Sequence, residues 1–385
     1  MIKIAQYENM FSLYLTIVLI IPSIFLCFWK RKSKILNLVI SILTIMLTLG
    51  IPSIQLLEFI GFIFVESLLV YFYAKFRKKC SSELLYFCIF ALSIFPLFFV
   101  RISAFKTEIA SFVGFTGISY ICFKIWQILF EIHDGKIEQL SIIDFFGFIL
   151  FFPSISSGPI ARYQEFNTNY IENTTDYFTE YFVLGVKKIL LGLFYKFAVA
   201  YFINTYFMVK VPDEITLINI VLYMYAYTLY LFFDFAGYSN IAIGIAALVG
   251  IRLPENFNKP FLACNMKEFW NRWHMSLSNW FNDYVFGRFV LNNIRNGLFK
   301  SSKTATRVAY LFTMTIMGLW HGFSIHYIIY GIYEGVLLVL TDVWIKSKTY
   351  RKFKKQKYYT LISRIICFQF IAFGMLLFSG HYFFE

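Results

Sequence analysis

The stretch FSLYLTIVLIIPSIFLCFW (residues 11–29) runs without a charge into the basic segment KRKSK (residues 30–34), and this pairing determines the fold class. Its 19 residues match the roughly 20 that an α-helix needs to cross the hydrocarbon core of a bilayer. The residues before it include one Lys and one Glu, and no A-x-A motif follows the run. We therefore predict a first transmembrane helix that is not cleaved as a signal peptide.

The rest of the chain repeats this pattern. Of its 385 residues, 59% are hydrophobic and 15% are charged, against roughly 45–50% and 25% in soluble proteins. This excess excludes a soluble, disordered, collagen-like or nucleic-acid-binding protein. We expect an all-α, polytopic membrane protein with a single integral-membrane domain over residues 1–385. Further spans are predicted at 35–54, 56–74, 84–100, 109–130, 215–235, 307–325, 327–345 and 360–379.

Three other apolar stretches are too short or too interrupted to span. Residues 141–153, 182–203 and 236–251 are predicted to form re-entrant or surface helices. Helix breaks are expected at Pro153, Pro159, Gly237 and Pro254. Irregular backbone at membrane depth is tolerated only inside the protein or beside a wet cavity, so these breaks indicate an internal cavity.

The basic residues predict which side of the membrane each loop faces. The net charge is +13, and 15 of the 35 Lys and Arg residues lie in three short loops, at 30–34, 75–79 and 346–357. Lys and Arg in short loops resist translocation, so all three loops are predicted to face the cytoplasm. Counting crossings then places both termini outside the cell membrane, with an odd number of spans.

The cysteines indicate neither a disulfide nor a metal site. None of the six forms a C-x-x-C pair, and four lie in apolar runs, where cysteine behaves as a small hydrophobe. We expect no bound metal.

The sequence changes character between residues 254 and 307, where Asn, Arg and Trp replace Leu and Ile. We predict that this stretch forms a polar, re-entrant or cytoplasm-adjacent core segment. Within it, MKEFWNRWHMSLSNWFNDYVF (residues 266–286) is interpreted as a helix from Met266 to about Tyr284. One face would carry Trp270, His274, Ser278 and Phe281, and another would carry Trp273, Leu277, Trp280 and Tyr284. Two interpretations remain: an interfacial helix with an aromatic belt, or a helix inside the protein whose polar face lines a reaction chamber.

A second singular feature is His321 in the motif MGLWHGF. Counted from a cytoplasmic Arg307, a rise of about 1.5 Å per residue places His321 roughly 21 Å across a core of about 30 Å. An ionisable residue at that depth is by default a functional hypothesis, and the alternative is a neutral histidine hydrogen-bonded to a neighbouring helix. Gly318 and Gly322 flank it and allow close packing of another helix. Asp234 in FFDFAGYSN is the other buried-looking charge, suited to orient a His or Arg or to cap a helix.

A buried histidine pair suits acyl transfer. A desolvated imidazole stays neutral at neutral pH and can accept a proton. With an activated thioester donor, the protein must only bring a hydroxyl to the carbonyl, stabilise the oxyanion and exclude water. The chain has no G-x-S-x-G, Walker A, H-E-x-x-H or G-x-G-x-x-G motif, which argues against serine hydrolase, NTPase, zincin and dinucleotide chemistry.

Four motifs together make the chain similar to the membrane-bound O-acyltransferase family. They are MKEFWNRWHMSLSNWFNDYVF (266–286), MGLWHG (317–322), SGPIARYQEF (157–166) and LFFDFAGYSNIAIG (231–244). The resemblance covers at least residues 115–345. The short length, the ENFNKPF lead-in and the absence of a PLGGNR segment after DYVFGRFV make the chain resemble the D-alanyl transfer branch rather than the alginate O-acetyltransferase-like branch.

This resemblance implies a ring of transmembrane helices around a central tunnel, with a catalytic histidine at His321 and a second signature histidine at His274. It implies a donor as well: D-alanine on the phosphopantetheine thioester of a small acidic carrier protein in the cytoplasm. The final acceptor implied is (lipo)teichoic acid of a Gram-positive cell wall. No cofactor is expected to be bound, since the phosphopantetheine arrives on the carrier. Other membrane proteins of the D-alanylation pathway are expected partners, and nucleic acid is not.

The resemblance also implies roles for further residues, with His321 as the general base. The residues expected to shape or polarise the thioester end of the tunnel are His274, Trp270, Asn271 and Ser278. Asp234 and Asp283 are candidates for orientation or charge pairing. Asn282 stands where a basic partner for Asp283 is expected, which puts that pairing in doubt.

A surface for docking the carrier is predicted around and after Tyr284. Carriers of this type are acidic and have an apolar patch beside the phosphopantetheine attachment point. The predicted docking residues are Lys267, Arg288, Phe289, Val290, Leu291 and Arg295. The alternative is that the basic residues snorkel to anionic lipid.

Two other functions remain open. One is O-acetylation of an exported cell-surface polysaccharide, against which the missing PLGGNR-type segment argues. The other is a proton-coupled transporter or flippase whose intramembrane histidine relays protons. Paired broken helices in two similar halves, typical of such transporters, are not evident in the sequence.

Overall fold

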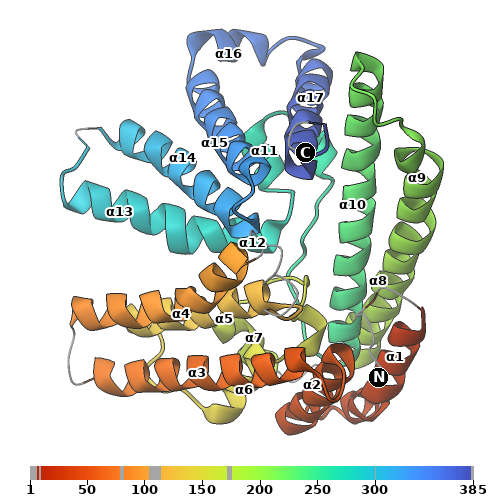
Figure 1. Cartoon of the computed structure of the whole chain (residues 1–385), viewed down its shortest axis with the longest axis vertical. Helices are drawn as coiled ribbons and strands as arrows, with labels where there is room; N and C mark the ends of the chain where they lie inside the picture. The colour runs from red at the N-terminus through yellow and green to blue at the C-terminus, as the bar shows by residue number, and fades with distance from the viewer. Residues whose placement is uncertain are drawn as a thin grey trace. The chain divides into compact units, whose positions relative to one another are not determined.

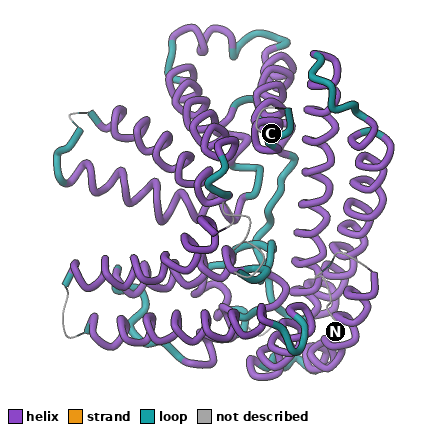
Figure 2. Tube along the Cα trace, in the orientation of Figure 1, coloured by secondary structure: helices purple, strands orange, loops and turns teal. Residues whose placement is uncertain are grey.

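The computed structural model describes residues 7, 10–78, 82–103, 114–170, 176–299 and 301–382. Residues 109–113 of the predicted span 109–130, Lys79 of the second basic loop and the two ends of the chain lie outside the described residues. Every regular element in the described ranges is helical (Figure 1, Figure 2). The prediction of an all-α protein is therefore confirmed.

The chain divides into two compact units. The first comprises Met1–Leu193 and Tyr238–Pro254, and the second comprises Phe194–Gly237 and Glu255–Glu385. Helix α10 (Leu217–Leu248) contributes residues to both units. The single domain over residues 1–385 stays a prediction.

The first unit packs its helices through small and polar residues. Its other helices are α1 (Met10–Phe28), α2 (Lys34–Leu49), α3 (Ile54–Arg77), α4 (Glu83–Ser103), α5 (Ile118–His133), α6 (Ile142–Ile149), η1 (Phe152–Ser154), α7 (Tyr163–Thr168), η2 (Phe178–Phe182) and α8 (Val183–Leu193). Ser23 on α1 donates a hydrogen bond to Asn37 on α2 over 2.7 Å. A Cβ on Gly244 of α10 would lie 2.7 Å from the Gly185 carbonyl oxygen of α8, so these helices cross in close contact.

The second unit is built around the antiparallel pair α14 (Ser302–His321) and α15 (Ile325–Ile345), which Figure 1 shows side by side. Its other elements are η3 (Phe194–Ala200), α9 (Tyr201–Tyr206), η4 (Met208–Lys210), η5 (Pro260–Leu262), α11 (Met266–Trp270), α12 (Met275–Phe281), η6 (Asn282–Phe286), α13 (Gly287–Arg295), α16 (Lys348–Phe353) and α17 (Tyr359–Ser379). Helices α11 and α17 pack against α15, and α13 packs against α14. The α14–α15 pair therefore joins the polar segment to the apolar helices.

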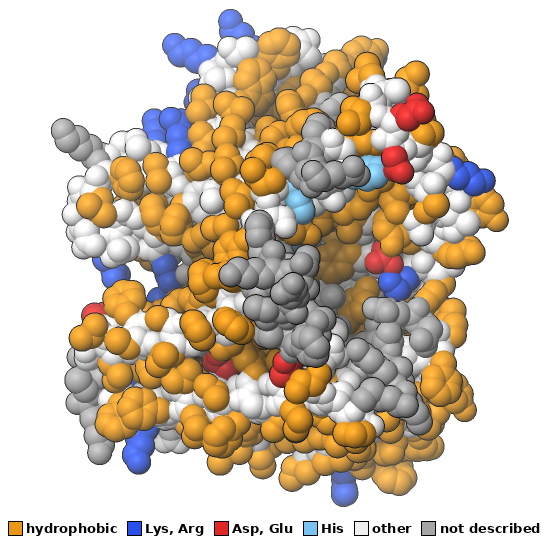
Figure 3. Space-filling model, in the orientation of Figure 1, with side chains coloured by type: hydrophobic (Ala, Val, Ile, Leu, Met, Phe, Trp, Pro, Cys, Tyr) orange, Lys and Arg blue, Asp and Glu red, His pale blue; other side chains and the backbone are white. Residues whose placement is uncertain are grey.

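Six described helices are long and apolar enough to cross a membrane: α1, α3, Glu83–Ile102 of α4, α10, α15 and α17. Their outward faces carry large exposed hydrophobic side chains, as at Leu57, Ile60, Phe64 and Leu68 of α3, which recur at helical spacing. Hydrophobic side chains are also abundant on the face drawn in Figure 3. These helices support the predicted multi-pass membrane protein.

Several predicted boundaries differ from the structure. The predicted break at Gly237 is wrong, because α10 continues from Leu217 to Leu248 and merges the stretches 215–235 and 236–251. A helical glycine costs only about 1 kcal/mol relative to alanine, and beyond it Ile241 and Ile245 are fully buried, so packing outweighs that cost. Helix α2 ends at Leu49, earlier than predicted, because Gly50 adopts φ 87°.

The expected irregular backbone around Pro153 and Pro159 is present. Helix α6 ends at Ile149, and the next regular element is the single turn η1. The chain then has no regular helix until α7 begins at Tyr163. This irregular segment belongs to the first unit.

Candidate active site

A turn at His274 interrupts the segment from Met266 to about Tyr284, which the sequence predicted to be a single helix. The chain forms two short helices, α11 and α12, with a turn between them. Asn256 stabilises this turn: its carbonyl oxygen accepts from the Met275 N–H over 2.9 Å, and its side chain accepts from the Ser276 hydroxyl over 2.6 Å. His274 adopts φ 43° and ψ 52°, a left-handed conformation that few non-glycine residues enter. The two predicted faces of a continuous helix are therefore wrong.

His274 is buried, with 5% of its surface exposed, and lies outside the six candidate spans. The Phe235 ring meets its imidazole edge to face, with the centroids 4.7 Å apart. Among the described residues, Nε2 has no hydrogen-bond partner. Burial, and then the charge of His321, lower the pKa of His274 to about 3. His274 is therefore neutral at pH 7, and its protonation is electrostatically coupled to that of His321.

His321 is the last residue of α14, whereas the sequence predicted a span continuing to residue 325. The helix ends because Gly322 turns into an extended conformation, with its N–H still bonded to the Gly318 carbonyl oxygen over 3.3 Å. Four aromatic rings lie around the imidazole at centroid distances of 4.5–6.3 Å: Trp320, Phe378, Tyr327 and Tyr330. His321 is partly exposed, and these rings form its immediate surroundings.

Trp270 ties the polar segment to α15. Its indole Nε1 donates to Glu334 Oε2 over 3.1 Å, and the two side chains are 7% and 1% exposed. Gly374 of α17 leaves room for the carboxylate, since a Cβ there would lie 2.5 Å from Glu334 Oε1. Glu334 is absent from the predicted site residues, although an acidic residue inside the apolar run IYEGVLLVL is a signal of intramembrane function.

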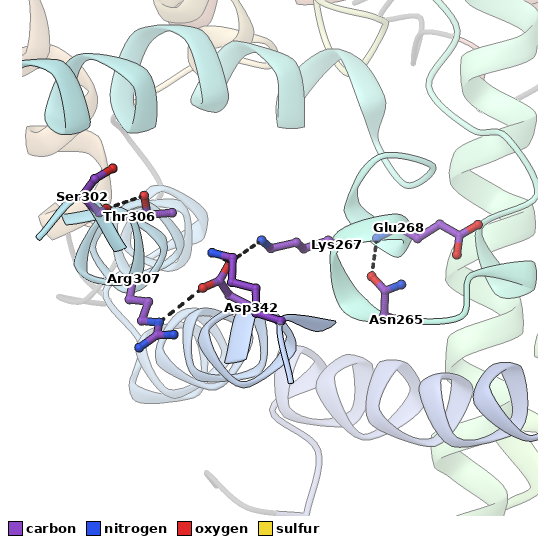
Figure 4. Close-up of polar contacts among 8 residues, drawn as sticks. Asn265, Lys267, Glu268, Ser302, Thr306, Arg307 and Asp342 are labelled. Carbon is purple, nitrogen blue, oxygen red and sulfur yellow. Dashed lines mark hydrogen bonds and ion pairs between the residues drawn. The ribbon is translucent and has the colours of Figure 1, made fainter. Parts of the chain in front are cut away.

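Asp342, near the end of α15, has three cationic partners, of which Figure 4 labels Lys267 and Arg307. It is fully buried, and its oxygens lie 2.8 Å from Lys267 Nζ, 2.6 Å from Lys346 Nζ and 3.3 Å from Arg307 Nε. Burial alone would lower the pKa of Lys267, but its hydrogen bonds to Asp342 and Tyr310 raise it above the ordinary value. The cluster therefore holds three positive charges against one negative charge. Asp342 is a second residue that the sequence prediction missed.

These contacts connect the polar segment to α15 at two successive positions, Lys267 with Asp342 and Trp270 with Glu334. His274, further along the segment, interacts electrostatically with His321. Along α15, the step from Asp342 to Glu334 is about 12 Å of helix. A further step of roughly 10 Å leads to Tyr327, whose ring centroid is 5.8 Å from that of His321. The segment from Lys267 to His274 therefore runs from the basic loop after α15 to the aromatic surroundings of His321.

Two predicted tunnel residues lie outside this buried cluster. Asn271 is exposed at the end of α11. Ser278 is partly exposed, and its hydroxyl donates to the Trp273 carbonyl oxygen over 3.1 Å. Ser278 therefore bonds to the turn between α11 and α12.

The two predicted aspartates have local partners. Asp234 of α10 pairs with Lys196 at 2.5 Å, and both belong to the second unit. Asp283 is exposed, and its carboxylate accepts from the Asn282 side chain over 3.3 Å. Asp234 thus has a lysine partner, where the sequence predicted a His, an Arg or a helix cap.

Most of the predicted docking residues lie on α13. Phe289 stacks on Phe312 of α14, with the centroids 4.8 Å apart. Arg288 and Val290 are partly exposed, while Leu291 and Arg295 are exposed. Lys267 belongs instead to the Asp342 cluster. Helix α13 therefore presents basic and apolar side chains together at its surface.

The described cysteines are free: Cys27, Cys88, Cys122, Cys264 and Cys367. Among the residues that the structure describes, no group of three or more His, Cys, Asp and Glu side chains is placed to hold a metal ion.

The family model of the MBOAT, membrane-bound O-acyltransferase family, matches residues 47–384. The chain belongs to this family and is an acyltransferase, so the resemblance drawn from its motifs is confirmed.

Similar proteins extend over nearly the whole chain. The teichoic acid D-alanyltransferase of Bacillus subtilis (strain 168) is 38% identical over 97% of this chain and 98% of its own length. The teichoic acid D-alanyltransferase of Streptococcus thermophilus is 35% identical over 97% of this chain and 94% of its own length. A probable alginate O-acetylase AlgI of Pseudomonas syringae is 31% identical over 69% of this chain but only 48% of its own length.

Proposed function

We propose that the chain transfers D-alanine from a phosphopantetheine thioester, carried by a small acidic cytoplasmic protein, across the membrane for D-alanylation of teichoic acid. The observation that carries this proposal is the aromatic site around His321 together with the buried His274 of the polar segment. End-to-end similarity to two teichoic acid D-alanyltransferases supports the choice of D-alanine. The acyltransferase family disfavours the transporter interpretation.

The two histidines have different roles in this proposal. A pKa of about 3 makes His274 a poor base at pH 7, so His321 takes the proton of the acceptor hydroxyl. The hydroxyl oxygen bonds to the thioester carbonyl carbon, and His274 polarises the carbonyl oxygen as it gains negative charge. The carbon–sulfur bond then breaks, the thiolate takes the proton from His321, and an ester and a thiol are released. The acceptor is either the polymer itself or a hydroxyl on a small membrane partner that relays the group.

O-acetylation of an exported polysaccharide is the competing acyl transfer. The probable alginate O-acetylases are similar to this chain, but the chain spans less than half of their length. The chain also lacks a PLGGNR-type segment after DYVFGRFV. D-alanyl transfer is therefore the preferred assignment, and donor competition separates the two: acetyl-carrier should not replace D-alanyl-carrier.

The central test replaces the proposed base. We expect His321→Ala to abolish D-alanine esters on teichoic acid when full-length protein in membranes is supplied with D-alanyl-carrier. His381→Ala is the matched control, because His381 lies beyond α17 and pairs with Asp213 at 3.6 Å. Ester formation by His321→Ala at the control rate would refute the catalytic assignment.

We also propose that α13 and Lys267 form the carrier-docking surface. The basic Arg288 and Arg295 would face the acidic carrier, while Val290 and the 56% exposed Leu291 would meet its apolar patch. Val290→Asp should therefore reduce pull-down of the carrier, whereas Val209→Asp, at an exposed position in η4, should not. Unchanged carrier binding by Val290→Asp would favour the alternative in which the basic residues contact anionic lipid.

The proposed orientation follows from the basic loops. Lys346 belongs both to the loop 346–357 and to the Asp342 cluster, so that cluster would lie at the cytoplasmic face. Both termini would then be extracellular, and a ring of helices around a tunnel would connect the two sides. A tag at either terminus should react with an impermeant reagent in intact cells, and protection of both tags would reverse the assignment.

A further inference from the structure

Glu334 is a buried carboxylate without a cation. Asp342 contacts three cationic side chains and Asp234 contacts one. For Glu334, by contrast, no ion pair with Lys, Arg or His occurs within the part of the chain that the structure describes, and its side-chain partner is the Trp270 indole. An ionised carboxylate without a counter-ion is costly inside a membrane-spanning helix, so Glu334 favours its charged form only when a cation binds beside it.

Glu334 also lies one helical turn from a residue that contacts His321. One turn before it on α15 is Tyr330, whose ring centroid is 6.3 Å from that of His321. Helices α14 and α15 are antiparallel, because Gly318 meets Gly331 and Leu311 meets Gly335. Side chains tilt toward the N-terminus of their own helix, so those of Glu334 and His321 lean toward each other along the pair. A donor whose carbonyl is at His321 would therefore extend toward Glu334.

We propose that Glu334 binds the α-ammonium group of the D-alanyl thioester and thereby selects an aminoacyl donor, an inference that rests on the proposed function. The ammonium sits on the carbon next to the thioester carbonyl, and an acetyl or propionyl donor has no such charge. In a site shielded from water, this cation needs a counter-ion as much as Glu334 does. One ionic contact then offsets the desolvation of both groups.

The local geometry allows the two partners of Glu334 to coexist. Oε2 accepts the Trp270 N–H, while Oε1 faces the position where Gly374 has no side chain. A carboxylate has about four acceptor positions, so the indole N–H and an ammonium can share it. Trp270 thus orients the carboxylate, and Glu334 provides the charge.

The experiment compares two competitors that differ only in the ammonium group: D-alanyl-pantetheine and propionyl-pantetheine. Full-length protein in vesicles with teichoic acid is supplied with labelled D-alanyl-carrier, and the concentration of each competitor that halves labelling is measured. The wild type should favour D-alanyl-pantetheine on the order of 10- to 100-fold, the range of a buried charged hydrogen bond. Glu334→Gln keeps an acceptor for Trp270 but removes the charge, so its ratio should fall to near one.

Glu66→Gln is the matched control. Glu66 is also a buried glutamate in a membrane-capable helix with a side-chain partner, accepting from Ser93 over 2.6 Å, but it belongs to the first unit. Its variant should keep the wild-type ratio. The stabilisation of purified Glu334→Gln by each thioester in a thermal-unfolding assay reports the same preference if this variant transfers too slowly to measure.

The outcomes separate the inference from the proposed function. A ratio that is unchanged in Glu334→Gln, or already near one in the wild type, would overturn the inference while D-alanyl transfer stands. Equal weakening of both competitors would assign Glu334 a structural role through Trp270, and would overturn it as well. Failure of the wild type to transfer D-alanine would refute the proposed function itself and the inference with it.

Discussion

The contact between Gly318 and Gly331 determines where His321 lies, and replacing Gly318 with alanine tests this. An added Cβ at Gly318 would be pressed against the Tyr327 carbonyl oxygen and would come within 3.0 Å of the Gly331 Cα. Alanine at Gly331, on the partner helix, would be equally crowded, since a Cβ there would lie 2.5 Å from the Met314 carbonyl oxygen. These neighbours are backbone atoms, so no side-chain rotation relieves the contact and the two helices must separate.

The expected cost is larger for activity than for stability. Overpacking costs about 1–3 kcal/mol, and alanine regains up to about 1 kcal/mol of helix propensity over glycine. The net loss in the free energy of unfolding should therefore be about 0–2 kcal/mol. His321 follows Gly318 by less than one turn, so its ring moves with the helix. A displacement of about 1 Å in a reacting group can reduce the rate on the order of 100-fold.

The assay is D-alanine ester formation by Gly318→Ala in vesicles, with thermal unfolding of the same preparation. Gly61→Ala on α3 is the matched control, because a Cβ there meets no atom within 4 Å. Gly318→Ala should transfer far more slowly than Gly61→Ala while unfolding at a similar temperature. Activity within about twofold of that control would refute the argument that this crossing positions the base.

Three further predictions concern the links around the site. Asp342→Asn should lower the free energy of unfolding by about 1–3 kcal/mol, which is less than for a fully buried pair because the cations around Asp342 are partly exposed. Lys346→Ala should lower it by less than about 1 kcal/mol. A larger loss in Lys346→Ala than in Asp342→Asn would contradict the view that Asp342 organises the cluster. Burial lowers the pKa of His274 to about 3, so its stabilising contribution is complete above about pH 6.5 and is lost as the pH falls toward 3. The thermal unfolding midpoint should thus decrease more steeply from pH 7 to pH 4 in the wild type than in His274→Gln. Equal slopes would exclude this contribution of His274 to stability. Asn256→Ala should lower the free energy of unfolding by about 1–3 kcal/mol and slow D-alanine transfer. Asn258→Ala should do neither, because the hydrogen bonds of Asn258 in the structure use its backbone atoms. Equal effects of the two substitutions would show that the Asn256 side chain does not hold the turn.

Membrane class and the location of the polar segment could be predicted from the sequence because both depend on composition over many residues. The turn at His274 could not. Helical periodicity from Met266 to Tyr284 takes no account of hydrogen bonds from Asn256, which precedes the turn by almost twenty residues. Those bonds replace a continuous helix with a bend, and only the folded chain shows which backbone groups they reach.

The buried acids show a different limit. Glu334 and Asp342 are both visible in the sequence as charges inside an apolar run, and that pattern alone marks them as candidates. Their roles depend on their partners, which come from α11 and α14 as well as from their own helix. The sequence contains the charges but does not reveal that one acid is surrounded by cations while the other meets an indole.

Asp342 and Glu334 have different partners, and this difference matches the order in which an incoming acyl donor would pass the two residues. At the end of α15 next to the basic loop, Asp342 pairs with three cations, so under the proposed function that end would attract an acidic carrier. About two helical turns further along α15, the acidic Glu334 hydrogen-bonds to the Trp270 indole, and in our proposal it binds a cationic ligand. At the end of α14, His321 is surrounded by aromatic rings. An anionic carrier with a cationic acyl group matches this sequence of sites in that order, whereas an uncharged acetyl donor would leave the second site without a partner.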